Sequence, residues 1–203
     1  ADGCAMDSAS MLGLVIFSAT AAVTPGPNNV MLTSSGATFG FRRSIPHILG
    51  IAAGIGCLSV AGGFGLAGLL AAVPQLHLLM KGVAILFLGY LAWKIGTASR
   101  ATGDRSTHPL TFIQAAGFQL VNPKGVTLLG SAIIAYSTGI DNILSDLVIM
   151  VPVFILTSLG SASTWCLFGA IIGRLLKEDG ALRKFNLAMA ALLVASMVPI
   201  FLG

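Results

Sequence analysis

Charged residues are scarce in this sequence. Lysine, arginine, aspartate and glutamate make up only 9% of the 203 residues, whereas 56% are hydrophobic and the mean hydropathy is +0.94. A soluble domain carries about 25% charged residues. Too few polar side chains are present to cover a water-exposed surface, so the composition excludes a soluble globular domain and indicates a polytopic membrane protein. The net charge of +4 is small, and we expect no nucleic-acid partner.

Acidic residues and cysteines are also few, and catalytic motifs are lacking. All seven acidic residues lie at the ends of apolar runs or between them, which argues against a carboxylate proton relay in the membrane. Cys4, Cys57 and Cys166 form no disulfide framework. The three histidines show no ligand spacing, so we expect no metal and no other cofactor. Neither GxSxG nor HExxH occurs, and we do not expect an enzyme.

Six apolar runs are each long enough to cross the hydrocarbon core of a bilayer, which takes ~20 helical residues. We place these spans at residues 9–34, 46–73, 76–96, 111–136, 146–173 and 183–202. Residues 1–10 are expected to be a non-native or flexible N-terminus. Residues 11–203 then form one domain, an all-α integral membrane protein with six transmembrane helices. Its two three-helix repeats, 11–97 and 111–203, enter the membrane from opposite sides.

Positive charges occupy alternate connections between these spans. The first, third and fifth connections carry Arg42, Arg43, Lys94, Arg100, Arg105, Arg174, Lys177, Arg183 and Lys184. The second and fourth connections carry none. Because lysine and arginine are retained on the cytoplasmic side, the odd connections are predicted to be cytoplasmic and both termini to be outside.

Prolines interrupt the first and fourth spans, at TPGPNN (residues 24–29) and VNPKG (residues 121–125). Each proline removes a backbone donor and clashes with the preceding turn. Such a break survives in hydrocarbon only where it faces protein or a water-filled cavity. Breaks at corresponding positions of two inverted halves mark the substrate site of a transporter, although two incidental kinks are the alternative. We therefore predict that the two breaks meet near mid-bilayer.

Polar side chains flank both breaks. The asparagines can satisfy freed backbone groups, bind a ligand, or do both. Lys124 is a cation well inside a span, where ionisable residues are functional by default; the alternative is a lysine that reaches a water-filled vestibule to stay hydrated. One lysine, two helix N-termini and several amides suit a small zwitterion. The candidate substrate-binding residues are Pro25, Gly26, Pro27, Asn28, Asn29, Gln119, Asn122, Pro123 and Lys124.

Two GxxxG pairs, Gly50 with Gly54 and Gly169 with Gly173, lie in the second and fifth spans. Small residues at this spacing let membrane helices approach closely. They predict helix packing rather than a binding role.

Four stretches, TPGPNN, GATFGFRRS, LAWKIGTA and FQLVNPKG, resemble the LysE/RhtB family of amino-acid exporters in order and spacing. The double asparagine and LAWKI are most similar to its cysteine/O-acetylserine exporter branch. The resemblance implies a multi-pass protein of the bacterial inner membrane that exports an amino acid or derivative in exchange for protons. A homo-oligomer is compatible with it. The motif positions that carry over are Pro25, Gly26, Pro27, Asn28, Asn122, Pro123 and Lys124.

Three functions compete. The first is a proton-coupled secondary exporter of small neutral amino acids or derivatives, in the class of cysteine, O-acetylserine, threonine and homoserine. The second is a transmembrane thiol/disulfide electron carrier through Cys57 and Cys166, which lie in the second and fifth spans without flanking prolines. The third is a passive channel, against which the lack of charged rings argues.

Overall fold

The fold is built from helices, and the described residues contain no strand. The computed structural model describes residues 6–98, 108–176 and 178–198, so Arg100, Arg105 and Lys177 of the predicted charge pattern lie outside the described residues. The helices are α1 (Ser8–Val23), α2 (Pro27–Phe39), η1 (Arg42–Ser44), α3 (Ile45–Gly63), α4 (Leu66–Ala72), α5 (Pro74–Gly96), α6 (Phe112–Val121), α7 (Pro123–Tyr136), η2 (Ile140–Asn142), α8 (Ile143–Leu175) and α9 (Asp179–Ala195). The prediction of an all-α protein is confirmed.

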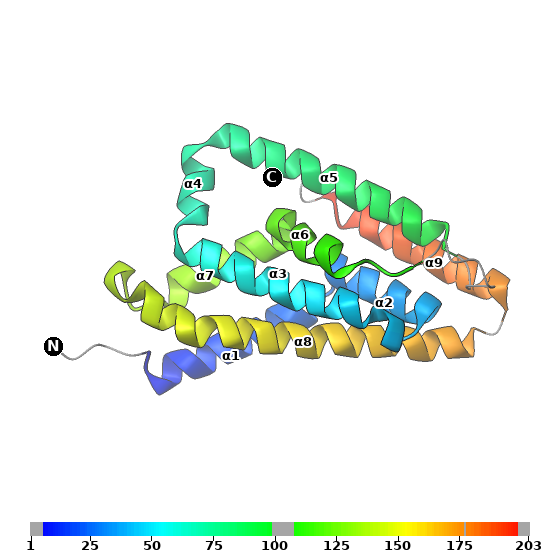
Figure 1. Ribbon diagram of the computed structural model, residues 1–203, viewed down its shortest axis with the longest axis horizontal. Coiled ribbons are helices and arrows are strands. Elements are labelled where there is room, and N and C mark those ends of the chain that lie inside the picture. The colour runs from blue at the N-terminus through cyan, green and yellow to red at the C-terminus, as the bar shows by residue number, and fades with distance from the viewer. Residues whose placement is uncertain (1–5, 99–107, 177, 199–203) are drawn as a thin grey trace.

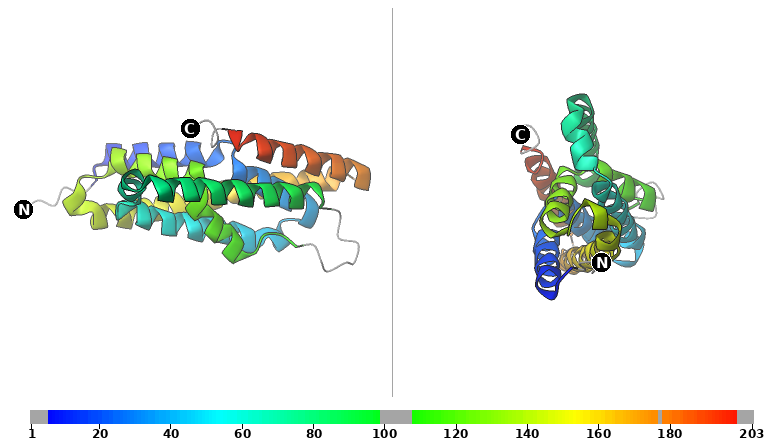
Figure 2. Two further views of the ribbon diagram at one scale, coloured as in Figure 1. Left: turned by 90° about the horizontal axis from the view of Figure 1, so that it is seen from above. Right: turned by 90° about the vertical axis from the view of Figure 1, so that its left-hand side faces the viewer.

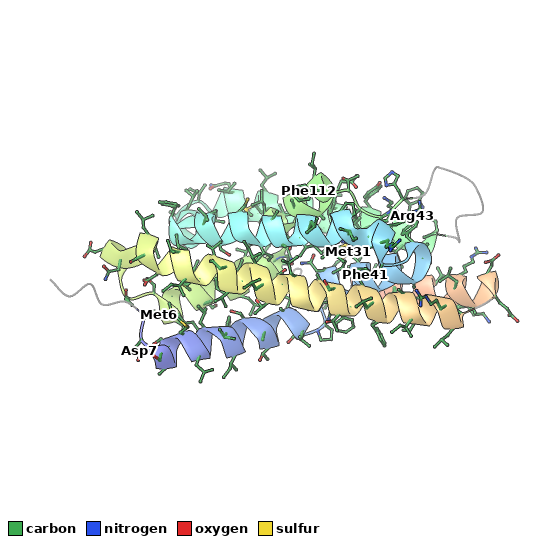
Figure 3. All side chains as sticks on the ribbon, turned by 60° about the horizontal axis from the view of Figure 1, so that its bottom comes forward. Met6, Asp7, Met31, Phe41, Arg43 and Phe112 are labelled. Atoms are coloured by element: carbon green, nitrogen blue, oxygen red, sulfur yellow. The ribbon has the colours of Figure 1, made fainter. Side chains whose placement is uncertain are left out.

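The helices lie along one long axis and form an elongated bundle (Figures 1 and 2). Helix α8 is the longest, with 33 residues, and it continues through Pro152 without a break. At 1.5 Å per residue it is about 50 Å long, so it exceeds the hydrocarbon thickness. Helix α4 runs across the bundle axis and links α3 to α5 at one end (Figure 1). Asp7 and Arg43 lie at opposite ends of the bundle (Figure 3).

Three stretches among the described residues are long and apolar enough to cross a membrane: Arg42–Gly63, Leu78–Gly96 and Ile143–Leu175. Helices α1 and α2 pass the same test together as a fourth span that bends by 55° at its break. Helix α6 is apolar but short, and α9 has 17 residues. The predicted break in the first span is confirmed, and the fourth predicted span is likewise divided between α6 and α7. Six crossings arranged as inverted repeats remain a prediction.

The extent of the second predicted span, 46–73, is wrong. Helix α3 ends at Gly63, and a turn at Phe64 and Gly65 leads into the separate helix α4. Gly65 has φ of +91°, a left-handed conformation that glycine adopts without steric cost. The apolar composition of this run hides the turn, because hydropathy alone does not separate a glycine that ends a helix from one inside it. The N-terminal helix also begins at Ser8, within the stretch 1–10.

Both GxxxG pairs pack helix on helix, as predicted. A Cβ atom added to Gly50 or Gly54 of α3 would lie 2.4 Å or 2.5 Å from a carbonyl oxygen of α6. One added to Gly169 or Gly173 of α8 would lie 2.0 Å or 2.2 Å from a carbonyl oxygen of α2. Gly36 of α2 approaches the backbone of α8 in the same way, at 2.0 Å. These contacts hold α2 against α8 and α3 against α6, and thereby fix the helices that carry the two breaks.

Large apolar side chains cover much of the outer surface. Ile134 and Leu86, for example, are 80% and 76% exposed. An aqueous surface rarely carries so many exposed apolar residues. In a bilayer these side chains face lipid, and the outer surface therefore agrees with the membrane class that the composition predicts.

Candidate functional site

The first break is closed by side chains. Gly26 is fully extended, with φ of −167° and ψ of −179°, and Pro27 is the first residue of α2. The Asn29 amide donates to the carbonyl oxygens of Ala22 and Thr24 at 3.0 Å each, and to that of Val23 at 3.5 Å. The Ser161 hydroxyl of α8 donates to the Ala22 oxygen at 2.7 Å. The end of α1 is thus capped from inside the protein.

The second break centres on Asn122, which is 3% exposed. Its backbone N–H donates to the Gln119 carbonyl at 3.3 Å, and its side-chain amide donates to Gln119 Oε1 at 3.2 Å. Its Oδ1 atom is buried without a hydrogen-bond partner. A buried polar atom without a partner is costly, so this oxygen is free to accept from a ligand.

The two breaks meet, as predicted, while their position near mid-bilayer stays a prediction. Asn28 and Gln119 exchange two hydrogen bonds, Nδ2 to Oε1 at 2.8 Å and Nε2 to Oδ1 at 3.1 Å. The Lys124 ammonium at the start of α7 donates to the Thr24 carbonyl of the first break. A Cβ atom on Gly26 would lie 2.9 Å from Lys124 Cδ, so the glycine lets the lysine pass close to the backbone.

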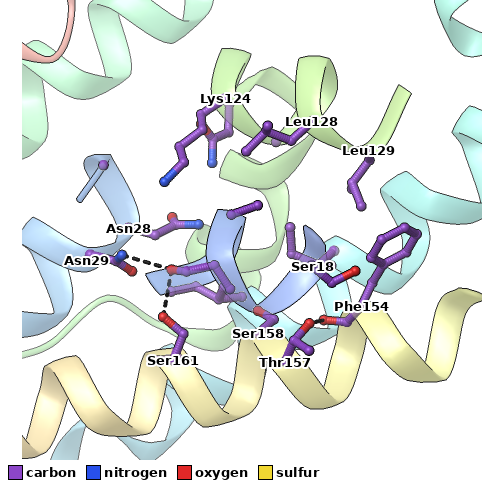
Figure 4. A pocket seen from close by; sticks show the side chains of 18 of the residues that line it. Ser18, Asn28, Asn29, Lys124, Leu128, Leu129, Phe154, Thr157, Ser158 and Ser161 are labelled. Atoms are coloured by element: carbon purple, nitrogen blue, oxygen red, sulfur yellow. Dashed lines mark hydrogen bonds between the residues drawn. The ribbon is translucent and has the colours of Figure 1, made fainter. Parts of the chain in front are cut away.

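A cavity opens beside this junction (Figure 4). It contains about 690 Å³ of empty space, including the open solvent at its mouth. Six of the predicted site residues line it, whereas Pro25, Gln119 and Pro123 do not. Pro25 is exposed and Gln119 is fully buried behind Asn28. The six are Gly26, Pro27, Asn28, Asn29, Asn122 and Lys124.

The cavity is positive and amphipathic. Lys124 is the only charged side chain among the described residues that line it. The N-termini of α2 and α7 also open onto it, and helix N-termini attract anions. Phe17, Leu129 and Phe154 form an apolar wall. A small molecule with a carboxylate and a short side chain fits these surroundings.

The hydroxyl groups opposite the breaks were not predicted from the sequence. Ser18 of α1 and Thr157, Ser158 and Ser161 of α8 line the cavity. Figure 4 shows Ser161 directed at the end of α1, whereas the Thr157 hydroxyl turns back to its own helix. Small polar residues at three- and four-residue spacing in an apolar helix were the available signal.

The two cysteines lie apart from the cavity. Cys57 is exposed on α3, and Cys166 is buried on α8 beside α2. Neither lines the cavity. A thiol relay would need two cysteines at a common site, so this arrangement gives no support to the electron-carrier alternative.

Asn29→Ala should lower the stability of the purified protein by roughly 1–3 kcal/mol, because buried carbonyls at the end of α1 lose their donor. Thermal unfolding in detergent measures the effect. Thr20→Val is the control, since its exposed hydroxyl donates only within α1 and its loss should change stability by less than ~0.5 kcal/mol. Equal melting temperatures for Asn29→Ala and the wild type would contradict a capping role.

Two broken helices that meet beside an amphipathic cavity in an apolar bundle define a membrane transporter. The family model described as "LysE type translocator" matches residues 19–201. The chain therefore belongs to the LysE family. It is a transporter rather than an enzyme, and a multi-pass protein of the inner membrane.

Similar proteins agree with this assignment. The chain is 32% identical over 189 residues to the cysteine/O-acetylserine efflux protein of Escherichia coli O157:H7, with 89% of this chain and 91% of that protein covered. It is 29% identical over 185 residues to the protein of the same name from Salmonella typhimurium strain LT2, with the same coverage. No solved structure matches the chain. The resemblance that the sequence motifs indicated is confirmed.

Proposed function

We propose that this protein exports small neutral amino acids or their derivatives, in the class of cysteine, O-acetylserine, threonine and homoserine, by proton-coupled secondary transport. The observation that carries the proposal is the meeting of the two breaks at one cavity, with Lys124 of the second break bonded to the first. The names of the relatives support the substrate class.

In the proposed site, the substrate carboxylate lies near Lys124 and the N-terminus of α7. Its ammonium donates to the free Oδ1 of Asn122. Asn28 keeps its two hydrogen bonds to Gln119 and lines the cavity, while Asn29 caps α1 and does not turn to the ligand. The Ala22 and Thr24 carbonyls already accept hydrogen bonds from Asn29 and Ser161, so they have no role in binding the substrate in this proposal.

We further propose that the chain crosses the membrane six times as two inverted repeats, with both termini outside. The α1–α2 pair, α3 and α5 alternate in direction, and the α6–α7 pair, α8 and α9 continue the alternation (Figure 1). Arg43 and Asp7 lie toward opposite ends of the bundle (Figure 3), and we assign the end with Arg43 to the cytoplasm because arginine is retained there. The cavity residues Phe17 and Leu129 belong to α1 and α7, on the outer side of the breaks.

The close glycine contacts between helices lie on the cytoplasmic side of the breaks in this arrangement. Gly36, Gly169 and Gly173 seal α2 against α8, and Gly50 and Gly54 seal α3 against α6. These contacts support a state that is closed toward the cytoplasm. Alternating access then requires the two glycine-lined interfaces to separate.

Purified protein in liposomes should exchange labelled cysteine or O-acetylserine saturably, and an imposed proton gradient should drive accumulation. Threonine and homoserine serve as further substrates, and lysine as the cationic comparison. Counter-substrate inside the vesicles should stimulate uptake. Flux that is linear in concentration and independent of the gradient would indicate a passive channel and overturn the proposal.

A further inference from the structure

A second cavity lies beside the C-terminal half of α2, on a different face of this helix from the first. It contains about 460 Å³ of empty space, including its mouth. Its walls come from the second half of α2, the start of α3, the end of α5 and residues 108–110. Neighbouring residues of α2 divide the two cavities: Leu32 lines the first and Met31 lines the second. Helix α2 therefore forms a wall shared by both.

His47 makes this cavity unusual. Its side chain is 0% exposed, it lines the cavity, and neither Nδ1 nor Nε2 has a hydrogen-bond partner. Two unpaired polar atoms in an apolar helix bundle are costly. A neutral imidazole offers one donor and one acceptor. Only a ligand or water that both accepts and donates hydrogen bonds satisfies the ring.

The charge of the cavity limits the class of ligand that it can bind. Lys94 of α5 lines it together with His47, and no acidic residue is among the described residues that do so. An ammonium and an imidazole N–H favour a carboxylate. The remaining imidazole nitrogen can accept from the ammonium of the same molecule. A zwitterionic amino acid carries both groups.

Fixed polar contacts hold the walls of this cavity. The buried Asn186 of α9 accepts from the Ser34 hydroxyl at 3.1 Å and donates to the Thr38 hydroxyl and the Ala98 carbonyl, each at 3.1 Å. The Ser44 hydroxyl donates to Ser35 Oγ at 3.2 Å. Ser34 and Ser35, which line the cavity with His47, are thereby held by α9 and by the turn before α3.

We propose that this second cavity is a loading subsite, which binds a zwitterionic amino acid through His47 and Lys94 before it reaches the helix breaks. The location of His47 near the start of α3, three residues after Ser44, places the cavity at the end of the bundle that carries Arg43. The inference rests on the proposed function, because that end is the cytoplasmic side from which an exporter takes its substrate.

Equilibrium dialysis of the purified full-length protein in lipid nanodiscs tests the subsite, with labelled cysteine kept reduced as the probe. The wild type should bind two cysteines per chain. Lys94→Met and His47→Leu should each remove one of them, or weaken it at least ~10-fold, by loss of a charged or buried hydrogen bond. Cysteamine, which lacks the carboxylate, should not compete at this subsite.

Lys81→Met is the matched control, because Lys81 lies on the same helix as Lys94 and does not line the cavity. It should leave both sites intact. A single bound cysteine in the wild type, unaffected by Lys94→Met, would show that water alone fills the cavity and would overturn the subsite while the proposed function stands. No saturable binding at all would instead count against the proposed function.

Discussion

Lys124→Met should reduce amino-acid export to the background of empty liposomes while the protein still inserts and purifies as the wild type does. Methionine keeps the apolar stem that passes Gly26 but removes the ammonium. A hydrogen bond to a charged group contributes ~1.5–3 kcal/mol, which corresponds to a loss of roughly 10- to 150-fold. The loss is expected to be at the upper end, since Lys124 both contacts the Thr24 carbonyl and provides the cavity's charge.

Two further variants separate charge from position. Lys124→Arg keeps the charge and should retain part of the export activity if charge alone is needed. Lys81→Ala removes a lysine that lies outside the cavity, and its export rate should match that of the wild type. Wild-type export by Lys124→Met would remove the ammonium from the mechanism.

Gly169→Ala should be the most destabilising single-methyl change on α8. The added Cβ would lie 2.0 Å from the Thr33 carbonyl oxygen, and a backbone atom cannot move aside as a side chain does. Overpacking of this kind costs about 1–3 kcal/mol or more. We expect a lower melting temperature and a smaller monodisperse fraction in detergent.

Gly160→Ala provides the matched control on the same helix. A Cβ at Gly160 would have no neighbour within 4 Å, so the substitution should be neutral or stabilise α8 by up to ~1 kcal/mol through helix propensity. If both variants melt at the same temperature, α2 and α8 are not in the close contact described above.

Sequence patterns located the helices better than their ends. The prolines at 25, 27 and 123 predicted two divided spans because a missing N–H and a ring clash act locally. The turn at Gly65 was missed because glycines occur throughout the spans of this chain, inside helices as well as at their ends. The long α8 shows the converse, since Pro152 was tolerated inside a continuous helix.

The residues of the candidate site were likewise predictable from the sequence only in part. Asn28, Asn122 and Lys124 could be selected from sequence because polar groups at membrane depth are expensive and therefore few. Asn186 could not, since an asparagine in a helix gains a role only from what packs beside it. The one signal for Ser161 was its spacing from Thr157 and Ser158. The contact of Ser161 with Ala22 joins residues 139 positions apart.

By itself, the sequence determined that this protein lies in a membrane, that its first and fourth spans are broken, and which family it belongs to. These properties depend on composition and on local backbone chemistry. Only the tertiary structure decided that Gln119 lies behind Asn28 rather than in the cavity, that Asn29 is a cap, and that His47 lines a second cavity. Those outcomes depend on which helix faces approach one another, and close glycine contacts between distant segments set that geometry.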